Sequence, residues 1–323
     1  MDKLILKEQD FCLRMQQEVL PYLEKRQQEL WLEREKGHKI HCVLYTADDP
    51  KGTVLISHGF TEFAQKYCEN SWYFLQNGYN VCIPEYCGHG FSYRLLDDPS
   101  LVHVDDYKRY LQDLLFAGQK VKQMASDLPL VLYGHSMGGG IAAAAAAAQP
   151  DLFSKVILSS PMIQPTPGKL RFFAAKTVAY AFCLIGKEKE YIMGQGPYDG
   201  QEVFEQSSST SKERFTYYKN MKDHQVKYQT HAASYRWFQN AARLNRDLMK
   251  YAWKHIQVPV MIIQAEEETS VSKDEMDRFA DKIQKAGRAQ VKRVTIPGTK
   301  HEIYSSNDDA MRKYWREILD FLK

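Results

Sequence analysis

The sequence lacks the features of several protein classes. It has no Lys/Arg cluster of the kind found in nucleic-acid grooves, since 43 Lys and Arg stand against 40 Asp and Glu, and the formal net charge is only +3. With 12 Pro, 18 Gly and 44% hydrophobic residues, the composition is that of a globular protein, not of a collagen, a coiled coil or a disordered tail. We therefore expect a folded protein without a nucleic-acid partner.

Long apolar runs are absent as well. Charged residues interrupt the start of the chain and no small-residue cleavage site follows, so no secretory signal is expected. The longest apolar stretch, residues 172–185, contains Lys176 and is shorter than the roughly 20 residues that cross a bilayer. The six cysteines form no CxxC pair, which fits reduced thiols better than disulfides or a metal site. These features predict a cytoplasmic protein.

Most of the chain alternates between short apolar runs and amphipathic segments. The amphipathic segments, such as 105–126, have the pattern of helices. The alternation predicts an α/β fold with a mostly parallel central sheet, helices on both faces and right-handed crossovers. The apolar runs typical of buried strands are residues 53–57, 79–84, 130–133, 156–159, 258–263 and 291–296.

The N-terminal region has a different pattern. Apolar residues recur at helical intervals in residues 4–35, which predicts helices that are broken at Pro21. Such an amphipathic segment packs on its own domain or lies on a membrane surface, and we expect the first. Residues 39–46 are expected to form a strand that turns back through residues 48–52 into the next strand.

Strand runs are also missing from residues 161–256, which are rich in aromatic residues. This predicts a helical cap inserted between two strands, over the carboxyl edge of the sheet where open α/β folds bind ligands. The expected domain organisation is then a first part of the core with its helical extension (1–160), the cap (161–256) and the second part of the core (257–323).

One segment has the pattern of a catalytic nucleophile. Gly134, Ser136 and Gly138 form a GxSxG motif that follows a strand run and opens a helix. A nucleophile on a sharp strand-to-helix turn needs glycine on both sides, because a side chain there would clash. The turn places the serine hydroxyl beside free N–H groups of the helix N-terminus, which favour developing negative charge. We predict that Ser136 is the nucleophile.

The serine needs a histidine as base and an acid that orients the histidine. In this fold the base follows the last strand, where His301 stands in a loop that contains glycine. The acid follows the strand at 258–263, where Glu266, Glu267 and Glu268 are consecutive. We favour Glu268 because the acid must project from the loop beyond the strand, and Glu267 is the alternative.

Two backbone N–H groups should form the oxyanion hole. One is that of Met137, directly after the nucleophile. The other should come from the loop after residues 53–57, where Gly59 permits close approach of the backbone and Phe60 is the candidate donor. The Phe60 side chain is then expected to line the acyl pocket, and His58 to brace the loop.

Five stretches together resemble the α/β-hydrolases of the lysophospholipase and monoacylglycerol lipase branch, in that family's order. In the family the acid takes the fifth position of the segment that corresponds to 264–268, which supports Glu268, and a glutamate there is most similar to bacterial lysophospholipases. Two cap stretches, 208–215 and 234–237, are also similar to that bacterial group. The five stretches are residues 58–62, 88–92, 134–139, 264–268 and 298–302.

The resemblance also implies substrate contacts. Polar residues near the equivalents of Glu62, Lys66 and Tyr304 hold the glycerol head group in monoacylglycerol lipases; Lys66 stands where arginine is usual, and Tyr304 where histidine occurs. We expect Glu62 at the mouth of the site, where it would meet a cationic choline or ethanolamine head. Cys87 replaces the family's usual arginine, so a salt bridge beneath that turn is expected to be missing.

These residues predict a serine hydrolase that cleaves the ester of a lysophospholipid or monoacylglycerol through an acyl-enzyme, without metal or organic cofactor. The aromatic stretch 172–185 is interpreted as a buried cap helix, as the wall of an acyl tunnel, or as a lid face that touches micelles or bilayers. Aryl or feruloyl esterases and aminopeptidases use the same triad and stay as alternatives. The remaining alternative is a lipid-binding protein without enzymatic activity.

Overall fold

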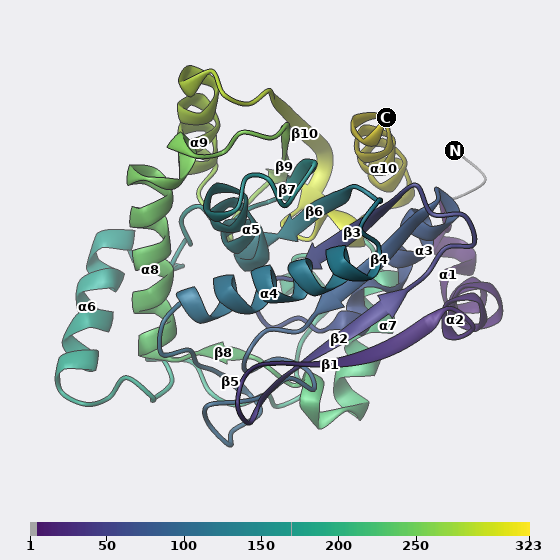
Figure 1. The fold of residues 1–323 in the computed structure, drawn as a ribbon. Helices are drawn as coiled ribbons and strands as arrows, with labels where there is room; N and C mark the ends of the chain where they lie inside the picture. The colour runs from purple at the N-terminus through teal and green to yellow at the C-terminus, as the bar shows by residue number, and fades with distance from the viewer. Residues whose placement is uncertain (1–4, 169) are drawn as a thin grey trace.

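The computed structural model describes residues 5–168 and 170–323, and a large sheet forms its centre (Figure 1). In this part of the chain the sheet has eight strands in the order β1-β2-β4-β3-β6-β7-β9-β10. From β4 to β10 all neighbours are parallel, whereas β2 is antiparallel to β1 and β4. The predicted α/β fold is confirmed. The strands are β1 Gln27–Glu35, β2 His38–Tyr45, β3 Gly52–Ser57, β4 Tyr79–Pro84, β6 Leu130–His135, β7 Lys155–Ser159, β9 Val260–Glu267 and β10 Val291–Lys300.

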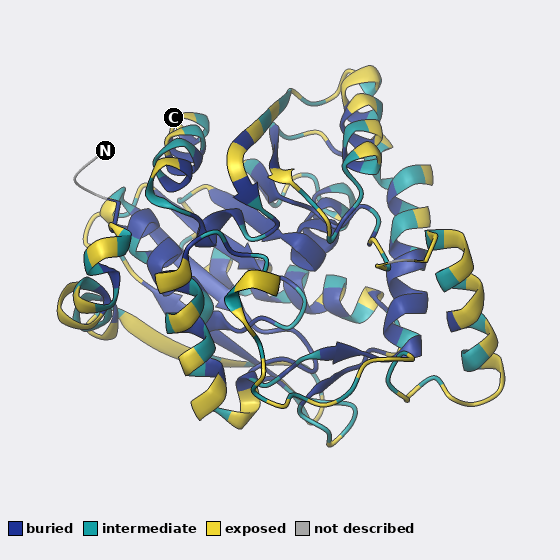
Figure 2. Cartoon of the chain, turned by 180° about the vertical axis from the view of Figure 1, so that it is seen from behind, coloured by how far each residue is buried: buried dark blue, intermediate teal, exposed yellow. Residues whose placement is uncertain are grey.

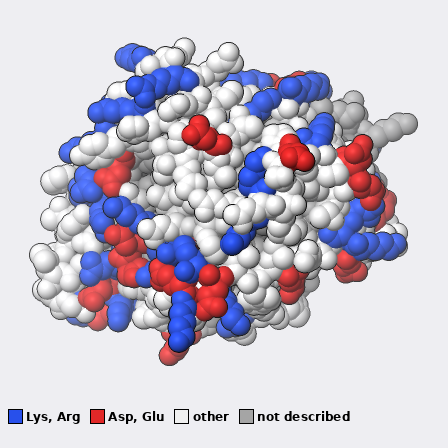
Figure 3. Space-filling model, in the orientation of Figure 1, with Lys and Arg blue, Asp and Glu red and all other residues white. Residues whose placement is uncertain are grey.

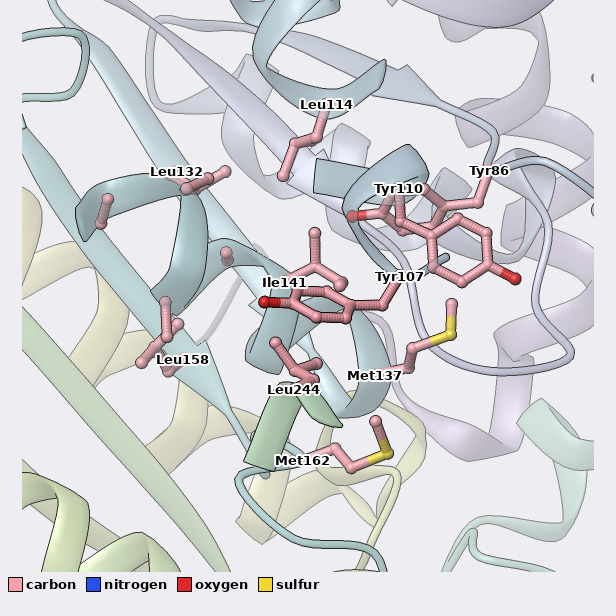
Figure 4. Packing of buried hydrophobic residues seen from close by; sticks show 14 of the residues in the cluster. Tyr86, Tyr107, Tyr110, Leu114, Leu132, Met137, Ile141, Leu158, Met162 and Leu244 are labelled. Atoms are coloured by element: carbon pink, nitrogen blue, oxygen red, sulfur yellow. The ribbon is translucent and has the colours of Figure 1, made fainter. Parts of the chain in front are cut away.

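Helices cover both faces of the sheet, and the central strands lie buried between them (Figure 2). One buried cluster includes α4, α5 and α9, and the other includes α3, α10 and the N-terminal helices. The small alanine side chains of α5 let this helix pack close to the sheet, and Ile141 of α5 lies beside Leu244 of the cap (Figure 4). The helices are α3 Cys68–Gln76, α4 Lys108–Met124, α5 Ser136–Ala148, α9 Lys273–Ala286 and α10 Asp308–Leu322.

The N-terminal region is helical only in its first half. The predicted helical range starts at residue 4, which lies outside the described residues, and its second half forms the edge strand β1 instead. Along β1 the half-buried Leu30 and Leu32, which pack on the core, alternate with the exposed Trp31 and Glu33. This period of two is that of a strand with one covered face, so the helix prediction for this part is wrong.

Pro21 does not break the N-terminal helix, contrary to the prediction. A π-helical turn, Met15–Val19, connects α1 (Phe11–Arg14) to α2 (Leu20–Glu24), and Pro21 stands in the first turn of α2. A wider turn accommodates a residue that has no N–H to donate. The predicted return of β2 into β3 is also wrong, because β4 lies between them and β2 forms its hairpin with β1.

Residues between β7 and β9 form a mainly helical insertion that we call the cap, and its helices lie on the left and at the lower right of Figure 1. Its helices are α6 (Phe172–Leu184), α7 (Lys212–His224) and α8 (Tyr235–Lys250). α8 contacts α5 of the core, and α6 packs on α8. The expectation of helices alone is wrong at one place, because the two-residue strand β8 (Ala232–Ala233) pairs with β5 (Leu101–Val102) of the core.

Charges of both signs lie side by side around the rim of the face seen in Figure 3, and the centre of this face is largely uncharged. This distribution agrees with the small net charge of the chain. No helix among the described residues combines the length and the apolar character that a membrane crossing requires.

A buried ion pair ties α7 of the cap to the core. The Arg214 guanidinium donates to the Glu69 carboxylate of α3 at 2.7 and 2.9 Å, and both side chains are fully buried. It also donates to the carbonyl oxygens of Leu6 and Ser306, at 2.8 and 3.1 Å. One side chain therefore joins the cap, α3, the N-terminal segment and the segment before α10.

We predict that Arg214→Met destabilises the protein by about 3–5 kcal/mol, because the Glu69 carboxylate would stay buried without its cation. Arg312→Met is the matched control: its partner Asp309 is 90% exposed, and the expected cost is below about 1 kcal/mol. Urea unfolding of both variants measures this difference. Equal stability of the two variants would show that the buried pair does not hold the cap.

Candidate active site

The turn between β6 and α5 holds Ser136 in a strained conformation. Its φ is +52°, a left-handed value that non-glycine residues rarely adopt. The flanking glycines make the turn possible: a Cβ on Gly134 would lie 2.7 Å from the Ala142 Cβ, and one on Gly138 would lie 2.1 Å from the Ser57 carbonyl oxygen. Both positions exclude any side chain. The sequence motif thus forms the sharp strand-to-helix turn that it predicts.

His301 lies directly in front of Ser136. Its Nε2 is 2.8 Å from the Ser136 Oγ, and the two residues are 7% and 8% exposed. The register of β10 against β9 shifts between Ile296 and Lys300, where Gly298 has a φ of +64°. This irregularity ends the regular pairing of β10 just before the histidine and directs the chain toward the serine.

Glu268 is the glutamate of the three that reaches the histidine. Its Oε1 and Oε2 lie 2.9 and 2.8 Å from His301 Nδ1, and its side chain is buried. Oε1 also accepts hydrogen bonds from the backbone N–H groups of Ser270 (2.9 Å) and Val271 (3.3 Å). Burial raises the pKa of the Glu268 carboxyl, but the hydrogen bonds and the charge of His301 outweigh burial and lower it. The carboxylate is therefore the preferred form.

The other two glutamates point elsewhere. Glu266 and Glu267 close β9 and are exposed. Glu266 accepts a hydrogen bond from the Gly298 N–H at 2.8 Å, which holds the loop before His301. The structure thus brings Ser136, His301 and Glu268 into one hydrogen-bonded row and leaves Glu267 outside it.

The two candidate oxyanion donors lie beside this row. Met137 is the second residue of α5, and the first N–H groups of a helix have no partner within the helix. Phe60 follows β3, and its ring packs against Trp237 of α8 with 4.3 Å between the ring centroids. The next residue, Thr61, has a φ of +59°, so the loop is strained directly beside the site.

His58 braces this loop from below. It is fully buried, its Nε2 accepts a hydrogen bond from the Tyr86 N–H at 3.0 Å, and its Nδ1 lies 2.8 Å from the Gly59 oxygen. Burial lowers the pKa of the His58 imidazole, so the ring is neutral and serves as a structural hydrogen-bonding group.

Glu62 holds the same loop from its buried side, and it is also among the residues that line the cavity beside Ser136. It is 3% exposed, and its carboxylate accepts hydrogen bonds from the Gly59 N–H (2.5 Å), the Tyr67 hydroxyl (2.5 Å) and the Tyr304 hydroxyl. Burial raises the pKa of this carboxyl, but the Lys66 ammonium and the hydroxyl donors outweigh burial and lower the pKa to about 2. The Glu62 carboxylate is thus ionised and already accepts three hydrogen bonds from the protein, although the residue also borders the cavity that contains Ser136 and His301.

Tyr304 and Lys66 are the remaining predicted substrate contacts. Tyr304 is fully buried, with its hydroxyl on Glu62 and its ring stacked against Tyr67. Lys66 is different: its Nζ donates to Glu302 at 2.7 Å, and its side chain lines a second cavity. Of the three, Lys66 lines this second cavity and Glu62 lines the one that contains Ser136, whereas Tyr304 lines neither.

The turn that contains Cys87 is held by an arginine that follows it in the sequence, Arg94. Cys87 is buried, and Arg94, six residues after Gly88, donates hydrogen bonds to the carbonyl oxygens of Gly88 and Gly90. Beneath the turn, the Glu85 carboxylate accepts from the N–H groups of Ala64 and Phe91, at 2.9 and 2.7 Å. The sequence pattern does not single out Arg94, because it follows the motif instead of preceding it.

A cavity of about 750 Å³ opens above Ser136 and His301, and we call it the acyl cavity. Its wall combines Ser136 and His301 with residues of the cap, among them Trp237 and Phe238, which the sequence analysis does not assign to the site. The one sequence feature that points to them is the cap stretch 234–237, which contains Trp237 and ends just before Phe238. The apolar residues of the wall include Phe60, Met162, Leu170, Val178, Ala179, Ile192, Trp237, Phe238 and Val271.

The aromatic stretch 172–185 is divided between this cavity and the solvent. Val178 and Ala179 of α6 line the cavity, while Phe173 and Leu184 are 78% and 87% exposed. Of the residues of α6, all of which the structure describes, Ala179 alone is buried, and the helix shows mainly exposed and intermediate colours in Figure 2. The interpretation of this stretch as a buried cap helix is therefore wrong.

Known proteins with similar sequences are lipid hydrolases. Lysophospholipase L2 of Escherichia coli (strain K12) is 25% identical over 284 residues, which cover 87% of this chain and 83% of that protein. Monoglyceride lipase of Rattus norvegicus is 33% identical over 134 residues, or 41% of this chain and 43% of the relative.

A solved structure shares this fold, and a family model matches most of the chain. A soluble variant of monoglyceride lipase from Saccharomyces cerevisiae, solved with a substrate analog, has a TM-score of 0.71 at 20% identity and covers 92% of this chain and 95% of its own. The model of the family described as serine aminopeptidase, S33, matches residues 48–308, which include the strained turn and the whole catalytic row. The chain therefore belongs to this family of α/β-hydrolases.

Proposed function

We propose that the protein hydrolyses the carboxylic ester of a lysophospholipid or a monoacylglycerol. The observation that carries the proposal is the hydrogen-bonded row of Ser136, His301 and Glu268 at the floor of a largely apolar cavity. A volume of about 750 Å³ suits a long acyl chain better than the acyl group of a small ester. The names of the relatives, lysophospholipase and monoglyceride lipase, support the same class of substrate.

In the proposed reaction the Ser136 hydroxyl attacks the ester carbonyl, and His301 Nε2 takes the proton. The N–H groups of Phe60 and Met137 then stabilise the oxyanion, each by about 3 kcal/mol. His301 returns its proton to the leaving glyceryl oxygen, which yields the alcohol and an acyl-enzyme. Water attacks the acyl-enzyme through the same histidine and releases the fatty acid. Glu268 keeps the Nδ1 proton of His301 in place and stabilises the imidazolium.

Glu62 has a positioning role in this scheme. Its carboxylate holds the Gly59 N–H at 2.5 Å, next to the Phe60 donor, and it is itself held by two tyrosine hydroxyls. Because the folded-state pKa of about 2 lies below the ordinary value near 4.5, this brace stabilises the fold above pH 4.5. The contribution of the Glu62 carboxylate to the free energy of unfolding is lost as the pH falls from 4.5 through about 2.

We also propose that the enzyme works in the reducing cytoplasm and touches a lipid surface when it takes up substrate. Its cysteines are free thiols in the described residues. The exposed apolar side chains on and around α6 offer the contact, and two of them, Leu170 and Met193, also line the acyl cavity. The exposed side chains are Leu170, Phe173, Leu184, Ile185 and Met193.

For the acid, Glu268→Gln is expected to lower kcat by about 10³–10⁴-fold, because the amide neither fixes the histidine tautomer nor stabilises the imidazolium. Glu267→Gln makes the same chemical change on an exposed neighbour and should keep wild-type kcat. Steady-state hydrolysis of a p-nitrophenyl ester measures both variants. A larger loss in Glu267→Gln would move the acid by one position.

The Glu62 carboxylate holds the loop that carries the Phe60 donor. Glu62→Gln is therefore expected to lower kcat on a lysophospholipid and on a monoacylglycerol by the same factor, with KM little changed, because both substrates use this loop. The measurement is kcat and KM on the two lipids with identical acyl chains. A change confined to one of them would instead assign Glu62 to its head group.

For the substrate, kcat/KM on p-nitrophenyl esters should rise by about fourfold for each methylene added, until the acyl chain fills the cavity. The wild-type enzyme should also release fatty acid from lysophospholipid or monoacylglycerol, and Ser136→Ala should release none. Activity restricted to acetate and butyrate esters, or to amino-acid anilides, would favour a small esterase or an aminopeptidase instead.

A further inference from the structure

A second cavity, of about 300 Å³, lies beside the acyl cavity, and we call it the polar cavity. Its wall joins residues 202–222 of the cap to the core residues Lys66 and Glu302. Thr61, Ser208 and Glu302 line both cavities, so the two spaces adjoin at the residue that follows His301. Only this shared wall lies between the space above Ser136 and the polar cavity.

The polar cavity is lined by charged groups. Among the described residues, its wall carries the lysines Lys66, Lys219 and Lys222 and the glutamates Glu202 and Glu302. Each lysine has a carboxylate partner: Lys66 lies 2.7 Å from Glu302, Lys222 lies 2.6 Å from Glu202, and Lys219 lies 2.6 Å from Asp223. An ammonium group has three donors, so each of these pairings leaves donors for a further acceptor.

Burial makes two of these ammonium groups costly to keep charged. The side chains of Lys66 and Lys222 are only 14% and 9% exposed, and burial lowers the pKa of Lys222 despite the Glu202 carboxylate. The proposed ester chemistry uses none of the three lysines. Packing of the cap does not explain them either, because they surround an open space instead of filling it. A phosphate would accept hydrogen bonds from the donors that the carboxylate pairings leave free on the three lysines, while Glu202 and Glu302 face the same space.

We propose that the polar cavity binds the phosphodiester head group of a lysophospholipid, with Lys66, Lys219 and Lys222 as its ligands. This proposal rests on the proposed ester hydrolysis. In such a substrate the glycerol backbone separates the acyl ester from the phosphate, as the shared wall separates Ser136 from the lysines. A monoacylglycerol has only hydroxyl groups at this end and gains little from three ammonium groups. The polar cavity therefore favours lysophospholipid over monoacylglycerol.

The test compares lysophosphatidylethanolamine with a monoacylglycerol of the same acyl chain. In Lys222→Gln the ratio of kcat/KM for the lysophospholipid to that for the monoacylglycerol should fall about tenfold, the size of one lost charge-assisted hydrogen bond. Lys219→Gln should lower the ratio in the same direction; its partner Asp223 is 33% exposed, so this second variant leaves no buried carboxylate unpaired.

Lys212→Gln is the matched control, because Lys212 begins the same helix, is exposed and does not line the polar cavity. It should keep the wild-type ratio. If Lys222→Gln and Lys219→Gln, folded by circular dichroism, also keep that ratio, the polar cavity does not bind the head group. If the wild-type enzyme hydrolyses neither lipid, the proposed function itself is wrong, and this outcome differs from an unchanged ratio.

Discussion

The tight packing of backbone and side chains around the Ser136 turn is the constraint on which the rest of the structure depends. The turn places a left-handed serine between two positions that accept no side chain, one against α5 and one against the carbonyl oxygens that end β3. Because β3 pairs with β6, the loop after β3 must pass beside the serine, and this brings Phe60 to it. The strain is held by a buried sheet on one side and by α5 on the other.

The proposed catalytic partners of Ser136 reach the same place through the parallel sheet. The carboxyl ends of β6, β9 and β10 lie along one edge, so loops far apart in sequence meet there. The bulged end of β10 then delivers His301, and the loop after β9 delivers Glu268, whose carboxylate is fixed by two backbone N–H groups before it meets the histidine. Orientation is thus supplied by backbone geometry, which costs no rearrangement during the reaction.

The cap divides the space above this edge into two environments. α7 is tied to the core by the fully buried Arg214–Glu69 pair and supplies Lys219 and Lys222 to the polar cavity. α6 packs on α8, lines the acyl cavity with Val178 and Ala179, and leaves large apolar side chains exposed. An amphiphilic substrate has the same division, with an apolar chain and a polar head on either side of the ester.

The sequence predicts those parts of the molecule in which local pattern and tertiary position coincide. The buried runs of β3, β4 and β6 and the glycine-flanked Ser136 belong to this group, and Glu268 is favoured because of its place beyond the strand. The strand β1 is missed because Leu30 and Trp31 fit a helical and a strand period equally over a short window. The hydrogen-bond partners of Glu62 and the polar cavity are not foreseen, because both depend on residues from separate parts of the chain, such as Tyr304, Lys222 and Glu302.

The most direct test of the account is the site at which an activated phosphonate reacts. A fluorophosphonate probe, followed by intact-mass measurement and peptide mapping, reports which hydroxyl the folded protein makes nucleophilic. We predict one adduct per chain, on Ser136, and its loss in His301→Ala, because the serine then has no base within 2.8 Å. Adduct formation at another serine, or an unlabelled wild-type protein with native circular dichroism, would contradict the central claim.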